Sequence, residues 1–478
     1  MELLILGIDG GDSRIINQMD MPFTQKLIAD RITVKINEDL WSRGWSEIAS
    51  GLHGVDTGAF YAKPKLDGTY NFTQSYNYSD YKKNPECSLF WERLNAQGKR
   101  VGIVNMPTTI PAPQVDGFFI AGAGSGFSPS SRIPESACYP REMARDLLPL
   151  DCIWEQRFRV SGVSNFDVFI ERCTTAIKQR TQLFISLNKK YNVDAGFIMH
   201  REFSTLTNLF TYLMRPLLNG KKATSRPLVR ISNFYRVLDD FINVLVTETS
   251  PQHVMIVSDH SVSPYTHSMN LNEFLAKHGH LKFRATGLKA RVRDSAREIW
   301  HQTKWKFNPQ SFHGAKPLVW RNPTIDYKTS LAFSSNYVPG VYLNDERFGG
   351  PVNERQRSQL IDQIIDSFNG DPTSKAFKLS ARRYREIYQN RLAGKMLPDI
   401  WVDLPETIFP EQRGKFIQRN PFFRSYEDLR LAHRDMITGI KGRNALCCVE
   451  QNFLGEIDPN TSNDLTVAYQ LILNHFRH

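Results

Sequence analysis

Short apolar segments that end in glycine or an acidic residue alternate with helical patterns over residues 1–270. The first is residues 3–12, an apolar run that ends in glycines and acids, and the clearest is residues 253–260, which end in Ser258-Asp259-His260. Apolar runs of this length, without polar alternation, are typical of strands that are covered on both faces. Their alternation with helical segments predicts an α/β fold with a doubly wound, mostly parallel sheet flanked by helices.

The same patterns place the other elements. Further strands are expected at 32–36, 100–105, 118–122 and 194–200, and helices at 13–29, 45–52, 90–94, 166–188, 203–213, 233–247, 353–367 and 379–392. Residues 398–402 are expected to form a strand with which the chain returns to the core sheet.

The 478 residues are too many for a single average domain. The alternation stops near residue 270, and residues 310–350 are rich in Pro, Asn and Gly. We therefore expect one α/β core made of residues 1–270 and 396–478, with residues 271–395 inserted as a cap domain.

The chain is basic, with 60 Lys and Arg against 49 Asp and Glu. Part of this excess lies in residues 277–306, where nine Lys or Arg face two acidic residues and alternate with aromatic residues. An excess of positive charge favours an anionic partner. A small anionic substrate is the first expectation, nucleic acid is a less favoured one, and a solvated face of the cap is the structural alternative.

The six cysteines are too few and too scattered for a disulfide framework, and no CxxC motif occurs. No apolar run is long enough to span a membrane, and the N-terminal residues lack the basic start of a signal peptide. These observations predict a cytoplasmic protein without a transmembrane segment. The oligomeric state is not predicted.

Two acidic strand ends carry the main chemical signal. In a parallel sheet the carboxyl ends of strands meet at one edge, which is where open α/β sheets bind ligands. Asp9, Asp259 and His260 are therefore expected to converge, and two carboxylates with an imidazole can bind a divalent cation. The alternative is a hydrogen-bonded structural group.

Several sequence blocks, taken in order, resemble the type I phosphodiesterase/nucleotide pyrophosphatase branch of the alkaline phosphatase superfamily. They include Leu4-Ile5-Leu6-Gly7-Ile8-Asp9-Gly10, Trp45-Ser46-Glu47-Ile48-Ala49-Ser50-Gly51-Leu52, Asn105-Met106-Pro107, Val257-Ser258-Asp259-His260, Pro398-Asp399 and His433-Arg434-Asp435. The resemblance covers nearly the whole chain. It implies an alkaline phosphatase-like core in which two divalent metals flank a Thr or Ser nucleophile at a helix N-terminus.

The resemblance implies one well-formed metal site for Zn, Mn or Mg, with Asp9, Asp259 and His260 as ligands. The second site is degenerate, because Ser204 and Asn208 occupy the positions of its Asp and His ligands, and only His433 matches. Uncharged Ser and Asn are weak ligands for a divalent ion. Glu202 or His200 is an alternative ligand for this second site.

The nucleophile position is also altered. An ungapped comparison places Trp41 in the Thr position, with Ser42 and Arg43 directly after it. A shift of one residue would make Ser42 the nucleophile and would let Arg43 contact the phosphate, whereas the structural alternative is that Ser42 caps the helix. Thr57 also replaces a His that is usual after this helix.

We therefore expect a metal-dependent hydrolase of phosphodiester or pyrophosphate-type esters, or a phosphoryl transferase, with a rebuilt active site. Ser42 or an activated water would attack phosphorus, and His433 would face the substrate or a weak second metal. Two alternatives stay open. One is an inactive protein of the same fold that binds a ligand or acts as a scaffold, and the other is a nucleic-acid-associated factor that uses the basic part of the cap.

Overall fold

The computed structural model describes residues 1–122, 133–147, 166–221, 226–284, 324–387, 394–412, 414–420 and 438–477. The chain forms two compact units. The first comprises Met1–Phe60, Gln74–Pro264 and His433–His478, and the second comprises Tyr61–Thr73 and Tyr265–Ala432. The division expected from the sequence, with a cap of residues 271–395, has different boundaries and stays a prediction.

The first unit contains an eight-stranded sheet with the order β2-β19-β9-β1-β8-β5-β6-β7. The five central strands from β9 to β6 are parallel, and β2, β19 and β7 make antiparallel pairs at the two edges. The strands span Leu3–Ile8 (β1), Ile32–Thr33 (β2), Val101–Met106 (β5), Gly117–Ala121 (β6), Cys138–Tyr139 (β7), Ala195–His200 (β8), His253–Val257 (β9) and Cys447–Val449 (β19). The short strands β10 (Ser261–Pro264) and β18 (Gly439–Gly442) form a separate antiparallel pair.

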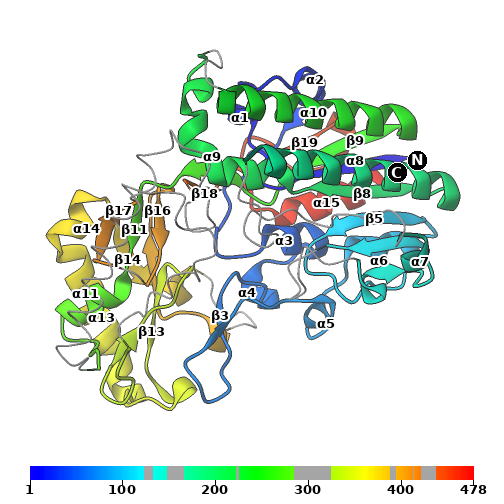
Figure 1. The fold of residues 1–478 in the computed structure, drawn as a ribbon. Helices are drawn as coiled ribbons and strands as arrows, with labels where there is room; N and C mark the ends of the chain where they lie inside the picture. The colour runs from blue at the N-terminus through cyan, green and yellow to red at the C-terminus, as the bar shows by residue number, and fades with distance from the viewer. Residues whose placement is uncertain are drawn as a thin grey trace. The chain divides into compact units, whose positions relative to one another are not determined.

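Helices cover both faces of this sheet, as two neighbouring residues of β8 show. Phe197 meets Trp45 of α3 and Phe90 of α6. The backbone of Gly196, whose position points to the other face, lies against Phe184 of α8. The long helices α8 and α10 run side by side (Figure 1). The sheet is thus doubly wound and mostly parallel, which confirms the predicted fold class.

The helices of the first unit span Ser13–Ile16 (α1), Pro22–Ala29 (α2), Gly44–Ser50 (α3), Gly54–Thr57 (α4), Tyr78–Tyr81 (α5), Phe90–Ala96 (α6), Met143–Leu147 (α7), Phe166–Tyr191 (α8), Glu202–Leu218 (α9), Arg226–Thr249 (α10) and Thr466–His475 (α15). The single helix expected at 13–29 is two helices, because a turn separates α1 from Pro22, which starts α2.

The second unit is built around a four-stranded antiparallel sheet with the order β12-β13-β15-β14. Helix α13 begins with a capping box between Asn353 and Gln356 and packs beside β14. The elements of this unit span Lys63–Pro64 (β3), Phe72–Thr73 (β4), His267–Met269 (β11), Leu271–Lys277 (α11), Ala332–Phe333 (β12), Gly340–Leu343 (β13), Glu354–Gly370 (α13), Pro372–Ala376 (α14), Ser380–Arg383 (β14), Ile400–Asp403 (β15), Ile408–Pro410 (β16) and Ile417–Arg419 (β17).

Two sequence-based expectations are wrong in the second unit. The expected helix at 379–392 begins instead as strand β14, which pairs with β15 from Ser380 to Arg383 and is followed by a short 3-10 turn. Residues 398–402 contribute to a strand, but β15 pairs with β13 and β14 and not with the eight-stranded sheet. In both places tertiary pairing overrides the local pattern.

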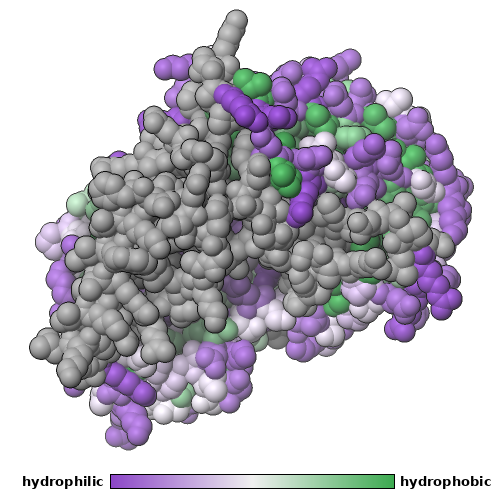
Figure 2. Space-filling model, in the orientation of Figure 1, coloured by the Kyte–Doolittle hydropathy of each residue, from purple (hydrophilic) through white to green (hydrophobic). Residues whose placement is uncertain are grey.

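The described part of the surface in Figure 2 is mainly hydrophilic, with hydrophobic side chains scattered singly. In the described ranges, the exposed large hydrophobic residues are Val168, Val229, Val244 and Tyr337. None of the helices described here has the length and apolar character needed to cross a membrane.

Candidate active site

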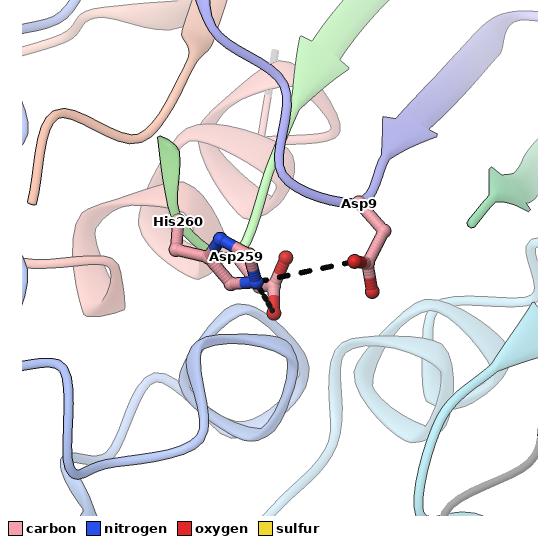
Figure 3. A group of neighbouring side chains, drawn as sticks. All are labelled: Asp9, Asp259 and His260. Carbon is pink, nitrogen blue, oxygen red and sulfur yellow. Dashed lines mark ion pairs between the residues drawn. The ribbon is translucent and has the colours of Figure 1, made fainter. Parts of the chain in front are cut away.

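The two acidic strand ends meet as expected. Strands β1 and β9 are parallel neighbours with Gly7 opposite Val257, so the residues that follow them leave the sheet at the same edge. Asp9, Asp259 and His260 point toward one another there (Figure 3). All three are buried, and one ligand atom from each lies within 4.8 Å of the others. This is the geometry of a candidate metal centre.

The hydrogen bonding of His260 decides which of its ring nitrogens faces the two acids. His260 Nδ1 lies 2.7 Å from the carbonyl oxygen of Ser261, which requires that Nδ1 carry the proton. In the neutral ring Nε2 is then an unprotonated acceptor. It lies 3.3 Å from Asp259 Oδ2 and 3.9 Å from Asp9 Oδ1. A lone pair facing two carboxylates is stable when a cation lies between them, and a backbone acceptor on Nδ1 is the usual support of a metal-binding His.

Positive charges surround the two carboxylates. Lys441 Nζ lies 3.5 Å from Asp259 Oδ2. Burial alone would raise the pKa of Asp9, but the charges of Arg201 and Lys441 and a hydrogen bond from Ser204 hold it below its usual value. Burial lowers the pKa of Lys441 to about 8, against the opposing attraction of the two acids.

Helix α3 packs against this group. Trp45 Nε1 donates to Asp9 Oδ2 over 3.1 Å, and the indole touches the backbone of Gly7. At the first position of the helix, a Cβ atom on Gly44 would lie 2.3 Å from the backbone oxygen of Asp259. The close approach of α3 to the acids therefore depends on glycine at this position.

Gly44→Ala is expected to destabilise the protein by about 1–3 kcal/mol and to displace Asp259, because the added methyl group overlaps backbone that cannot rotate away. Gly370→Ala is the control, since nothing lies within 4 Å of the added carbon there. Urea unfolding measures the difference, and equal stabilities of the two variants would contradict the described contact.

Trp41 and Ser42 are both buried in the loop before α3. Trp41, in the Thr position of the resemblance, is stacked on Phe60 with ring centroids 3.8 Å apart. The Ser42 hydroxyl donates to Glu47 Oε1 and accepts from the Gly54 backbone N–H over 2.9 Å. No described contact joins Ser42 to Asp9, Asp259 or His260.

Arg43 and Thr57 are held by backbone oxygens. Arg43 donates to the carbonyl oxygens of Phe60 and Gln74, and its charge also acts on Lys441. The Thr57 hydroxyl donates to the carbonyl oxygen of His53. The roles predicted for Ser42 and Arg43 stay predictions.

The positions of the degenerate second metal site lie on and beside α9. Ser204 donates its hydroxyl to Asp9 Oδ1, so it acts as a neutral partner of that carboxylate. Glu202 forms a bidentate ion pair with Arg180, and His200 is completely buried, with its pKa lowered to about 3 by burial and the Arg180 charge. Asn208 is only half-buried. His433 lies outside the described residues.

Three residues around the acids, Trp45, Arg201 and Lys441, are not predicted from the sequence. Trp45 is part of a family block, but an aromatic residue in an amphipathic helix normally indicates core. Lys441 lies on the short strand β18, whose first and last residues are glycines, and no sequence motif marks it. The +11 charge was the only signal, and it does not locate a residue.

The comparisons with known proteins agree with this fold. The family model of the type I phosphodiesterase / nucleotide pyrophosphatase matches residues 3–407. Phosphonoacetate hydrolase from Sinorhizobium meliloti 1021 in complex with phosphonoformate is similar, with a TM-score of 0.52, 10% identity, and coverage of 99% of this chain and 96% of that chain. Its complex with phosphonoacetate gives a TM-score of 0.51, 9% identity, and coverage of 99% and 96%.

Murine ectonucleotide pyrophosphatase / phosphodiesterase 5 aligns with a TM-score of 0.46, 11% identity, and coverage of 98% of this chain and 94% of that chain. No curated protein matches the chain. The family match extends over most of the sequence, and the two phosphonoacetate hydrolase structures share the fold. The chain therefore belongs to the type I phosphodiesterase/nucleotide pyrophosphatase family.

Proposed function

We propose that the protein is a metal-dependent phosphoester hydrolase that acts on phosphodiester or pyrophosphate-type substrates. Family and fold support the class of reaction. The observation that carries the metal dependence is that Nε2 of His260 faces two buried carboxylates, while its Nδ1 donates to the carbonyl oxygen of Ser261. Asp9, Asp259 and His260 would hold the ion, with Zn, Mn and Mg as candidates.

The bound ion would supply a Lewis acid for the phosphoryl oxygens and lower the pKa of a bound water. Neighbouring side chains and backbone groups would hold the ligands of the ion in place. Trp45 and Ser204 hold the two oxygens of Asp9 in fixed directions, and the Gly10 backbone N–H donates to Asp259 Oδ1 over 3.3 Å. Fixed ligands of this kind limit rearrangement during the reaction.

Lys441 and Arg201 support an anionic substrate. Both place positive charge near Asp9, and Lys441 Nζ lies 3.5 Å from Asp259 Oδ2. Cationic side chains can neutralise a phosphoryl group in place of a metal, although they do not supply a bound water. We therefore propose one metal and two cationic side chains in place of two metals. His433 as a second ligand, or as a contact of the substrate, stays a prediction.

The described contacts favour an activated water as the attacking group over Ser42. The Ser42 hydroxyl donates its hydrogen bond to Glu47 and accepts one from the Gly54 backbone N–H. Ser42→Ala is thus expected to leave kcat/KM within about tenfold of the wild-type value, whereas loss of a true nucleophile costs about 10³-fold or more. The assay is hydrolysis of bis(p-nitrophenyl) phosphate by the folded fraction of the variant. A loss of kcat/KM of about 10³-fold or more would identify Ser42 as the nucleophile.

The proposal itself is tested by removing metals with a chelator and restoring Zn, Mn or Mg separately before the same assay. Turnover that returns with one of these ions supports it. An inactive member of the family is the second candidate, and the stacked Trp41 in the nucleophile position favours it. That candidate predicts no turnover with any of the ions, although a phosphate-like ligand still raises the melting temperature.

A cytoplasmic location is part of the proposal. It rests on the five cysteines of the described residues, which are all free and buried. The basic segment 277–306, on which a nucleic-acid-associated role would depend, lies outside the described residues from position 285 onward.

A further inference from the structure

A second buried group of potential ligands lies beside α3. Glu38 precedes the helix, Glu47 is on it, and His53 caps the next helix, α4. Neither Glu side chain is exposed to solvent, and His53 is 5% exposed. One ligand atom from each of the three residues lies within 4.8 Å of the others.

Two carboxylate oxygens of this group lack a partner. Glu47 Oε1 accepts from Ser42, and Glu38 Oε2 accepts from the Leu465 backbone N–H over 3.2 Å. Glu38 Oε1 and Glu47 Oε2 are buried and meet no hydrogen-bond donor in the described ranges. The two carboxyl groups lie close enough to hydrogen-bond to each other if one of them carries a proton. A buried carboxylate oxygen without a donor is costly, so the site must contain a proton or a cation.

His53 supports the carboxylates but does not serve as a ligand. Its Nδ1 accepts from the Val55 backbone N–H over 3.2 Å, so Nε2 carries the proton of the neutral ring. Nε2 lies 3.4 Å from Glu47 Oε1 and 3.5 Å from Asp39 Oδ2. This is the opposite arrangement to that of His260, and it leaves only oxygen ligands for a cation.

The charge balance of the group is negative. Glu47 and Asp39 face the His53 imidazole, and Glu38 is repelled by the charges of Glu47 and Asp39. Burial raises the pKa of Glu47 to about 7, and burial together with the charges of Glu47 and Asp39 raises that of Glu38 well above its usual value. Either one shared proton or one bound cation would relieve this repulsion.

We propose that Glu38 and Glu47 bind a hard divalent cation, such as Mg²⁺, Mn²⁺ or Ca²⁺, at a site separate from Asp9, Asp259 and His260. Oxygen ligands select these ions over Zn²⁺. The ion would tie the segment before α3 to the helix itself. Since α3 begins at Gly44 against Asp259 and carries Trp45 against Asp9, the ion would fix the helix that supports the candidate active site.

The test uses the full chain carrying Asp259→Asn, which removes one ligand of the other site. After chelation, Mg²⁺, Mn²⁺ and Ca²⁺ are added singly, and bound ion and melting temperature are measured. We expect about one ion per chain and a higher melting temperature. No bound ion and no shift would overturn the proposal in favour of a shared proton, whatever the outcome of the activity assays.

Adding Glu47→Gln to the Asp259→Asn chain is expected to abolish both the binding of the ion and the rise in melting temperature. If the Glu47→Gln chain does not fold, Glu38→Gln replaces it in the same background. Asp239→Asn in the same background is the control, because the Asp239 carboxylate is buried but accepts from Phe23 and Thr24. Retention of the ion after both Glu substitutions would also overturn the proposal.

Discussion

Asp259→Asn is expected to lower kcat/KM for a phosphodiester by about 10³-fold or more and to remove the ion from the candidate active site. The substitution keeps the shape of the side chain but removes one of two negative charges that face His260 Nε2. It also removes the charge that pairs with Lys441. A neutral amide is a much weaker ligand for a divalent cation than a carboxylate.

Asp239→Asn is the matched control for this experiment. Asp239 is 2% exposed and Asp259 is 3% exposed, but the hydrogen bonds of Asp239 go to the start of α2. The measurements are elemental analysis of the purified protein and steady-state kinetics. If Asp259→Asn kept both its ion and its activity while folding normally, the catalytic metal would have to lie elsewhere.

Arg180→Met is expected to destabilise the protein by about 3–5 kcal/mol, because it leaves the Glu202 carboxylate buried without its partner. The pair joins α8 to α9 through two hydrogen bonds of 2.8 and 3.0 Å, and both side chains are at least 95% buried. Equilibrium unfolding in urea measures this loss. A change below about 1 kcal/mol would mean that water reaches the carboxylate.

Replacing both members of the pair, with Arg180→Met and Glu202→Leu, is expected to restore much of the lost stability. This double variant also tests whether Glu202 substitutes for a missing metal ligand, as the sequence allowed. We expect its metal content to equal that of the wild type. A loss of one ion would assign Glu202 to a metal site.

The strand ends were predictable because their chemistry is local. An apolar run fixes a buried strand, parallel neighbours end at one edge, and Asp9 and Asp259 therefore had to approach each other. Ser42 was harder, because its role depends on which partner its hydroxyl meets. Glu47 and Gly54 are those partners, and neither is marked as such in the sequence.

Other features depend on tertiary contacts that no local pattern encodes. Glu38, Glu47 and His53 come from three separate segments, and each alone is an ordinary polar residue. The segment 380–383 has no strong strand character, and its pairing with β15 is what makes it a strand. The family resemblance identifies Ser204 and Asn208 as the residues at the positions of the second metal site. It does not predict that the charges of Arg201 and Lys441 act on Asp9.

The edge of the central sheet next to β9 is completed by β19, a strand from near the end of the chain. Ser258, which links β9 to Asp259, also exchanges hydrogen bonds with Leu446. During translation β9 therefore leaves the ribosome long before its neighbour exists, and its open edge can pair with other strands. The yield of folded protein should depend on how quickly the segment that contains β19 is synthesised, and on chaperones that cover β9 until then.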